Sequence, residues 1–132
     1  NSANNAIAPF SNPTLKNIEL IGRGVSAQTV GLKLREGTKA LISNLSISNF
    51  DVCIEVEHDQ TLEHVVNGDL IIIETKTSDF SQKVSFKGSK DAGGAVINQA
   101  LVDQASASSN IKLDNLGAVS QSWINGTWYR NL

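Results

Sequence analysis

The sequence predicts an all-β fold in which the chain coils as a parallel β-solenoid, and three observations point to this class. Charged residues make up only 18% of the 132 residues and aromatic residues 5%. Short apolar runs alternate with polar residues and are broken by Gly, Asn or Asp, which is typical of strands with one buried face. Segments of similar pattern recur at intervals suited to one solenoid coil.

Length and charge set the first limits. A chain of 132 residues and 14.1 kDa is large enough for one domain with its own core. Its formal charge of −2 and its pI near 5.6 exclude a strongly basic surface, so no nucleic-acid partner is expected. A single cysteine, Cys53, excludes an internal disulfide, and we expect its thiol to be buried. No apolar run has the length of a membrane span, and any targeting segment is expected to lie outside this sequence.

The first element is expected to be an extended leader or linker over residues 1–13, where small polar residues are bounded by Pro9 and Pro13. Alternating runs begin at Leu15, so the solenoid coils are assigned to residues 14–132. Within that span, residues 117–132 are expected to form a C-terminal cap.

Four segments share an Asn or Asp followed by an apolar residue, any residue and another apolar residue. They begin at positions 17, 44, 69 and 110, which gives successive spacings of 27, 25 and 41 residues. Stacked coils bring equivalent positions to about 4.8 Å from one another, so the pattern predicts a polar ladder beside an apolar one. The polar ladder would consist of Asn17, Asn44, Asp69 and Asn110, and the apolar ladder of Ile18, Leu45, Leu70 and Ile111.

A second set of strands repeats after 22 residues, because residues 30–34 align with residues 52–56. Lys33 and Glu55 would then form a cross-strand ion pair between adjacent coils. Asn and Asp tolerate left-handed backbone angles, which suits the turns between solenoid strands. The same turn residues also bound the strands of a β-sandwich, which is the alternative architecture.

Residues 93–105 interrupt the repeat, and their apolar residues recur at spacings of three and four. This pattern predicts a short amphipathic helix that is inserted between coils or covers an end of the solenoid. A solenoid needs such a cover because its last coil exposes unpaired backbone and apolar side chains. The aromatic residues of the tail are expected to cover the last coil or, alternatively, to stack on sugar rings as a glycan platform. They are Trp123, Trp128 and Tyr129.

Parts of the sequence resemble a known family. The relevant runs are NPTLKNIELIG at residues 12–22, VGLKLREGTKALISNLSISNFDVCIEV at residues 30–56, and the closing motif with Gly117, Trp123 and Trp128. They are similar to right-handed parallel β-helices of the pectin-lyase-like type in secreted or lipid-anchored bacterial surface proteins. The resemblance implies a right-handed parallel β-helix, of which this chain would be the C-terminal portion. It also implies a secreted or cell-surface location and a polysaccharide ligand or spacer role.

The densest ionisable cluster runs from Glu55 to His64 and contains both histidines. Imidazole and carboxylate groups bind zinc, which makes His58, Glu63 and His64 weak candidates for a metal site. Their spacing matches no strict metal motif, and a solvated loop is expected between the histidines, so no metal or cofactor is assigned. Arg35 and Glu55 are candidates for contacting a sugar from the outer face of the sheet.

The sequence contains no G-x-S-x-G nucleophile motif and no glycine-rich phosphate loop, so no catalytic residue is assigned. It predicts a non-catalytic cell-surface or secreted β-helix module that binds polysaccharide or serves as a scaffold. The alternative is a fragment of a carbohydrate-active enzyme, a polysaccharide lyase or hydrolase, whose catalytic coils lie mostly outside this chain.

Polysaccharide is one expected partner, and the first coil suggests another. This coil would present an open parallel edge, because the upstream coils that such proteins normally carry are missing from the sequence. We expect the edge to pair with upstream coils of a parent chain or with a second copy, or to be covered by residues 1–11.

Overall fold

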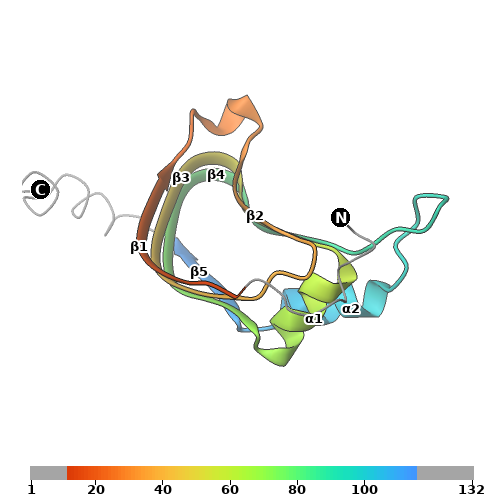
Figure 1. Ribbon diagram of the computed structural model, residues 1–132. Helices are drawn as coiled ribbons and strands as arrows, with labels where there is room; N and C mark the ends of the chain where they lie inside the picture. Colours follow the sequence, from red (N-terminus) through yellow and green to blue (C-terminus); the bar gives the residue numbers. More distant parts are fainter. Residues whose placement is uncertain (1–11, 116–132) are drawn as a thin grey trace, which may run out of the picture.

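The computed structural model describes residues 12–115. Their elements are, in chain order, β1 (Thr14–Ile21), the 3₁₀ turn η2 (Val25–Ala27), β2 (Val30–Leu34), β3 (Ala40–Glu57), α1 (Asp59–Asn67), β4 (Leu70–Lys87), α2 (Gln99–Ala107) and β5 (Ile111–Asn115). Figure 1 shows the long strands as stacked, curved ribbons, with both helices across the open side of the curve. No helix within residues 12–115 is long and apolar enough to cross a membrane.

All neighbouring strands of the sheet run parallel, in the order β1-β3-β4-β5, with β2 also beside β3. The first half of β3 pairs with β1 and its second half with β2, so β1 and β2 together form one coil. β3 and β4 are each 18 residues long and pair along almost their whole length. The described residues therefore form a parallel β-helix, as the sequence predicts, and the sandwich alternative is wrong.

The first two predicted spacings are confirmed by the strand register. Ile18 pairs with Leu45, which is the 27-residue step, and Val30 pairs with Val52, which is the 22-residue step. Side chains at equivalent positions therefore stack in columns. The buried residues of successive coils form one continuous core along these columns.

The third rung of the predicted ladder is wrong. Leu45 pairs with Thr75 and not with Leu70, so the step from β3 to β4 is 30 residues instead of 25. Leu70 stacks on Ala40 at the start of the strand, and Asp69 lies in the turn before it. The physical reason is that α1 lies between the two strands and lengthens this coil.

The fourth rung, Asn110 with Ile111, is also misplaced in the prediction. Ile111 pairs with Ile72, which belongs to the column of Ile42. The Asn110 side-chain amide donates to the carbonyl oxygen of Val65 at 2.7 Å and ties the start of β5 to α1. The Asn–apolar pattern thus marks two different positions, a bend within the early strands and a strand start in the later segments.

A bend within the strands lets the sheet wrap around the core. Asn17, Asn44 and Glu74 occupy this bend, with left-handed φ angles of 59°, 55° and 53°. Asn visits this region more readily than Glu does, because its short polar side chain bonds locally. The Asn44 side-chain amide donates to the side-chain oxygen of Asn17, so the predicted polar ladder is confirmed for this pair. It does not continue, since Glu74 takes the third position.

The helices occupy the part of each coil that the strands leave open (Figure 1). The helix predicted within residues 93–105 is confirmed in part, because α2 forms there with the Asn98 side chain accepting from the Leu101 amide. The loop predicted between His58 and His64 is wrong, because this segment is the first part of α1. The buried face of α1 is interleaved with charged residues in the sequence, which obscured its period. That face consists of Thr61, Leu62, His64 and Val65.

The core lies between the curved sheet and the two helices. Its central column is Ile42, Ile72 and Ile111, which are 1%, 0% and 9% exposed. Cys53 is free and buried, as the sequence predicts. Burial raises the pKa of its thiol to about 11, so it is an unreactive packing residue.

Removing the middle residue of this column should destabilise the fold. Ile72→Ala leaves a cavity between two buried neighbours, so we expect the free energy of unfolding to fall by about 2–5 kcal/mol. Urea titration followed by circular dichroism measures this change. Ile21→Ala is the matched control, because Ile21 is 63% exposed and its loss should change stability by less than about 0.5 kcal/mol. Equal effects of the two substitutions would contradict the register.

Replacing the strained residue in the bend should stabilise the protein. Glu74→Asn puts the residue that favours left-handed angles at φ 53°, so we expect a gain of roughly 0.5–1 kcal/mol, seen as a higher Tm. Glu74→Gln is the control, since it removes the same charge without favouring that backbone region. If Gln stabilises as much as Asn does, the charge and not the bend is responsible.

Candidate functional site

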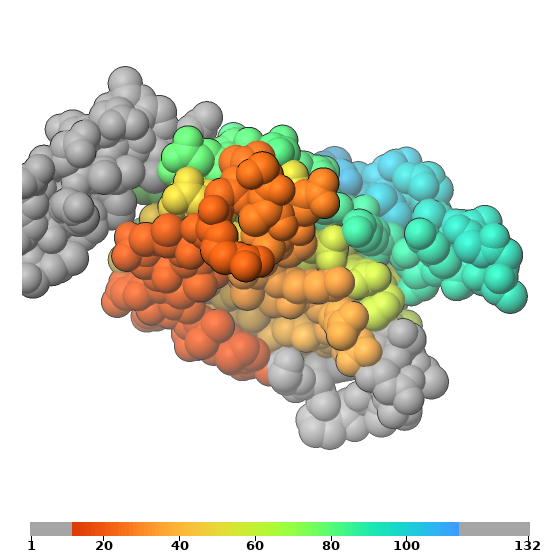
Figure 2. Space-filling view, turned by 90° about the horizontal axis from the view of Figure 1, so that it is seen from above, coloured from red at the N-terminus to blue at the C-terminus, as the bar shows by residue number. Residues whose placement is uncertain are grey.

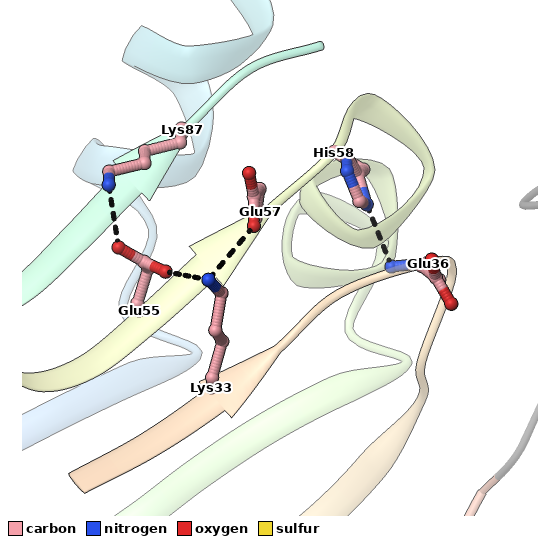
Figure 3. A network of polar contacts seen from close by, with 6 residues as sticks. All are labelled: Lys33, Glu36, Glu55, Glu57, His58 and Lys87. Atoms are coloured by element: carbon pink, nitrogen blue, oxygen red, sulfur yellow. Dashed lines mark hydrogen bonds and ion pairs between the residues drawn. The ribbon is translucent and has the colours of Figure 1, made fainter. Parts of the chain in front are cut away.

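Charged side chains gather where β2, β3 and β4 end side by side and α1 begins (Figure 3). We call four of them the charged cluster: Lys33, Glu55, Glu57 and Lys87. Beside it, His58 and the backbone of Glu36 join the start of α1 to the turn after β2. Parallel strands bring their carboxyl ends to one edge, which is why residues far apart in the sequence meet here.

Glu55 is the centre of the charged cluster. It lies in register with Lys33 of the preceding coil and also reaches Lys87 of the following coil. The Nζ atoms of Lys33 and Lys87 lie 3.1 Å from Glu55 Oε2 and 2.7 Å from Glu55 Oε1, respectively. The Glu55 side chain is only 5% exposed, whereas the lysines are about half exposed and cover it. The predicted Lys33–Glu55 pair is confirmed, and it extends into a bridge across three coils.

The lysines keep Glu55 charged. Burial alone raises the pKa of a carboxyl group, but hydrogen bonds and positive charges from Lys87 and Lys33 outweigh it and hold the pKa of Glu55 below its ordinary value of 4.5. The same bond and the Glu55 charge raise the pKa of Lys87. Each Glu55 oxygen is engaged by one lysine. Glu55 therefore ties coils together, a different role from the sugar contact that the sequence suggested.

His58 is held in one neutral tautomer. The backbone N–H of Glu36 donates to His58 Nδ1 at 3.1 Å, so Nδ1 carries the lone pair and Nε2 carries the proton. The backbone N–H of His58 donates in turn to the carbonyl oxygen of Lys87 at 2.9 Å. His58 is thus fixed to the coils on both sides and presents Nε2 as a donor.

A groove of about 410 Å³ lies beside the charged cluster. Its lining residues are Glu57, His58, Lys87, Gly88, Ser89 and Lys90. The N–H of Asp59 donates to Ser89 Oγ and the N–H of Ser89 donates to Asp59 Oδ1, both at 2.8 Å, which fixes one wall to α1. Gly88 is required there because a Cβ would lie 2.9 Å from Val102 of α2. The groove is therefore built from backbone and side chains that the fold holds in place.

The structure brings only some of the predicted site residues to this groove. Arg35 follows β2 at the same edge, but its side chain is exposed and it is not part of the lining. On α1, Glu63 is exposed and His64 is buried, with its Nδ1 3.7 Å from Asp69 Oδ2. Burial lowers the pKa of His64. No three metal-binding side chains gather within residues 12–115, so His58, His64 and Glu63 share no centre.

The remaining predicted ligand-binding residues are Trp123, Trp128 and Tyr129, which lie outside the described residues. Conversely, the sequence prediction missed Lys87, Ser89 and Lys90. The signal for them is the repeat of Ser-Asn-Phe at residues 48–50 as Ser-Asp-Phe at residues 78–80, which gives the 30-residue step. This step aligns Glu57 with Lys87 and brings the residues after Lys87 beside His58.

Comparison with known proteins agrees with the coiled architecture. A family model described as a pectate-lyase-like β-helix domain matches residues 1–129. Neither a curated protein nor a solved structure matches the chain. The family match covers all of the described residues, including the groove and the charged cluster.

Neutralising Glu55 should destabilise the protein in a pH-dependent way. At pH 7, Glu55→Gln removes two charge-assisted hydrogen bonds, and we expect the free energy of unfolding to fall by roughly 1–3 kcal/mol. Because the folded-state pKa is lowered, the wild-type advantage is complete above the ordinary pKa of 4.5 and is lost as the pH falls through the folded value. Chemical unfolding at several pH values measures the difference.

The control for this substitution is Glu57→Gln. Glu57 Oε1 lies 3.6 Å from Lys33 Nζ, which is beyond hydrogen-bond distance, so its loss should have a smaller effect. A Glu55→Gln protein whose deficit persists unchanged at low pH would show that packing, and not the carboxylate charge, is responsible.

Proposed function

The chain belongs to the pectate-lyase-like β-helix family, and from this premise we propose that it is a non-catalytic module of a secreted or cell-surface bacterial protein. Its ligand is polysaccharide, which lies in the groove lined by Glu57, His58 and Lys90. The observation that carries the proposal is that this groove combines fixed hydrogen-bond donors with an available acceptor.

Sugar hydroxyl groups donate and accept hydrogen bonds, so a site for them needs groups of both kinds. Nε2 of His58 and the amine of Lys90 supply donors. Glu57 Oε1 supplies an acceptor, because it accepts no hydrogen bond from the described residues and its ion pair with Lys33 is long, at 3.6 Å. These three side chains can hold neighbouring hydroxyl groups of one sugar chain.

The groove is also preorganised for binding. His58 is fixed through both its ring and its backbone, and Ser89 is fixed through two bonds to Asp59. A ligand therefore does not need to order these groups, which lowers the entropic cost of association.

The state of Glu55 favours binding over glycoside cleavage by the charged cluster. Hydrolysis of a glycosidic bond uses a carboxyl group that keeps its proton at the working pH. The lysine partners of Glu55 favour its charged form, which is the opposite requirement. They also occupy both of its oxygens.

A panel of neutral and uronic-acid polysaccharides tests the proposal by isothermal titration calorimetry. We expect at least one of them to bind, and Lys90→Ala or Glu57→Gln to weaken this binding about tenfold through loss of one hydrogen bond to a charged group. The matched control is Lys112→Ala, an exposed lysine on β5 outside the groove lining. Its affinity should equal that of the wild type.

Two results would contradict the proposal. Absence of binding to the whole panel would leave the chain as a structural spacer. Release of unsaturated or shortened sugars, lost in Glu55→Ala or Arg35→Ala, would instead identify it as part of a carbohydrate-active enzyme.

A further inference from the structure

The outer edge of β1 is the uncovered end of the core. Within residues 12–115, β1 pairs with β3 alone. Ile18 and Leu20 of β1 are only partly buried, whereas Leu45 and Ile47, their register partners in β3, are 3% and 0% exposed. The last rung therefore presents apolar side chains beside backbone donors and acceptors that a further strand can pair with.

We infer that this edge binds the same edge of a second copy of the chain, as a two-fold antiparallel strand pair. The sequence of β1 is self-complementary in one register. When Lys16 of one copy lies opposite Glu19 of the other, Leu15 lies opposite Leu20. Two-fold symmetry makes each of these pairs occur twice, so a small edge gains four matched pairs.

The two faces of the sheet agree with this register. Leu15 and Leu20 are on the core side, because the residues they stack on, Ile42 and Ile47, are buried. Directly opposite residues in an antiparallel pair share a face, so the leucines of the two copies extend one core.

Lys16 and Glu19 are exposed on the outer side of β1. The inferred register places each lysine opposite a glutamate of the other copy, which is a stabilising cross-strand pair. A slip of one residue would bring Lys16 opposite the partly buried Ile18 and break both matches.

The bend in β1 also suits the symmetry. The two-fold axis passes between Asn17, at the bend, and Ile18. It therefore carries the strand arm before the bend onto the arm after it. Two bent edges can then follow one another on both sides of the axis.

Charge disfavours the competing assemblies that use β5. In a head-to-tail stack, Lys112 would lie over Lys16 of the next copy, because each follows a residue of the same column, Ile111 and Leu15. In an antiparallel pair of two β5 strands with Ile111 opposite Leu113, Lys112 would face its own copy. Like charges directly opposite destabilise strand pairs, so the β1 edge is favoured.

Light scattering coupled to size-exclusion chromatography of the full chain tests this inference. We expect the wild type to be a dimer at micromolar concentration. Lys16→Glu or Glu19→Lys alone replaces both attractive pairs with repulsive ones and should raise the dimer dissociation constant by about tenfold or more. Lys112→Glu is the control and should remain a dimer, and circular dichroism establishes that each variant is folded.

Two rescue experiments distinguish this interface from a general charge effect. The double variant Lys16→Glu/Glu19→Lys should dimerise like the wild type. An equimolar mixture of the two single variants should form heterodimers, because one copy supplies only acidic and the other only basic residues at these positions. A monomeric wild type, or single variants that stay monomeric when mixed, would overturn the inference.

Discussion

Stacking of equivalent residues in successive coils is the constraint on which this structure depends. A single coil of this chain cannot enclose a core, because its apolar side chains are exposed toward the neighbouring coil. The column of Ile42, Ile72 and Ile111 shows the solution, with each residue covered by the next. The same constraint builds the charged cluster, since Glu55 lies in register with Lys33 and is buried only because lysines of the two neighbouring coils cover it.

The columns are preserved while the connections between them vary. The step is 27 residues at Ile18 and 22 at Val30, because the chain segment that includes η2 lengthens the first coil between β1 and β2. From β3 to β4 the step is 30 residues along the whole strand, since α1 lies in the connection. Insertions are tolerated at these places because they lie outside the stacked strands. The groove is formed at such a place, where β4 ends and α1 begins.

The sequence predicts the fold class and the first two steps because the polar residues at these bends are both Asn. Asn17 and Asn44 carry a visible pattern, and the Lys33–Glu55 pair follows from the 22-residue step. The third step is hidden because Glu74 takes the left-handed position, which sequence propensity does not predict for Glu. Without that step, Lys87 cannot be placed beside Glu55, and the groove residues that follow it are not recognised. The helix α1 is missed for a related reason, since its buried His64 is polar.

The central claim is that β3 and β4 lie in parallel with a 30-residue step, and long-range amide NOEs in the NMR spectrum test it most directly. The account predicts cross-peaks between residues near Leu45 and Thr75, and again between residues near Ile54 and Val84, since paired strands lie about 4.8 Å apart. Cross-peaks that link Leu45 to Leu70, or a pattern in which the partner numbers fall as β3 advances, would contradict it.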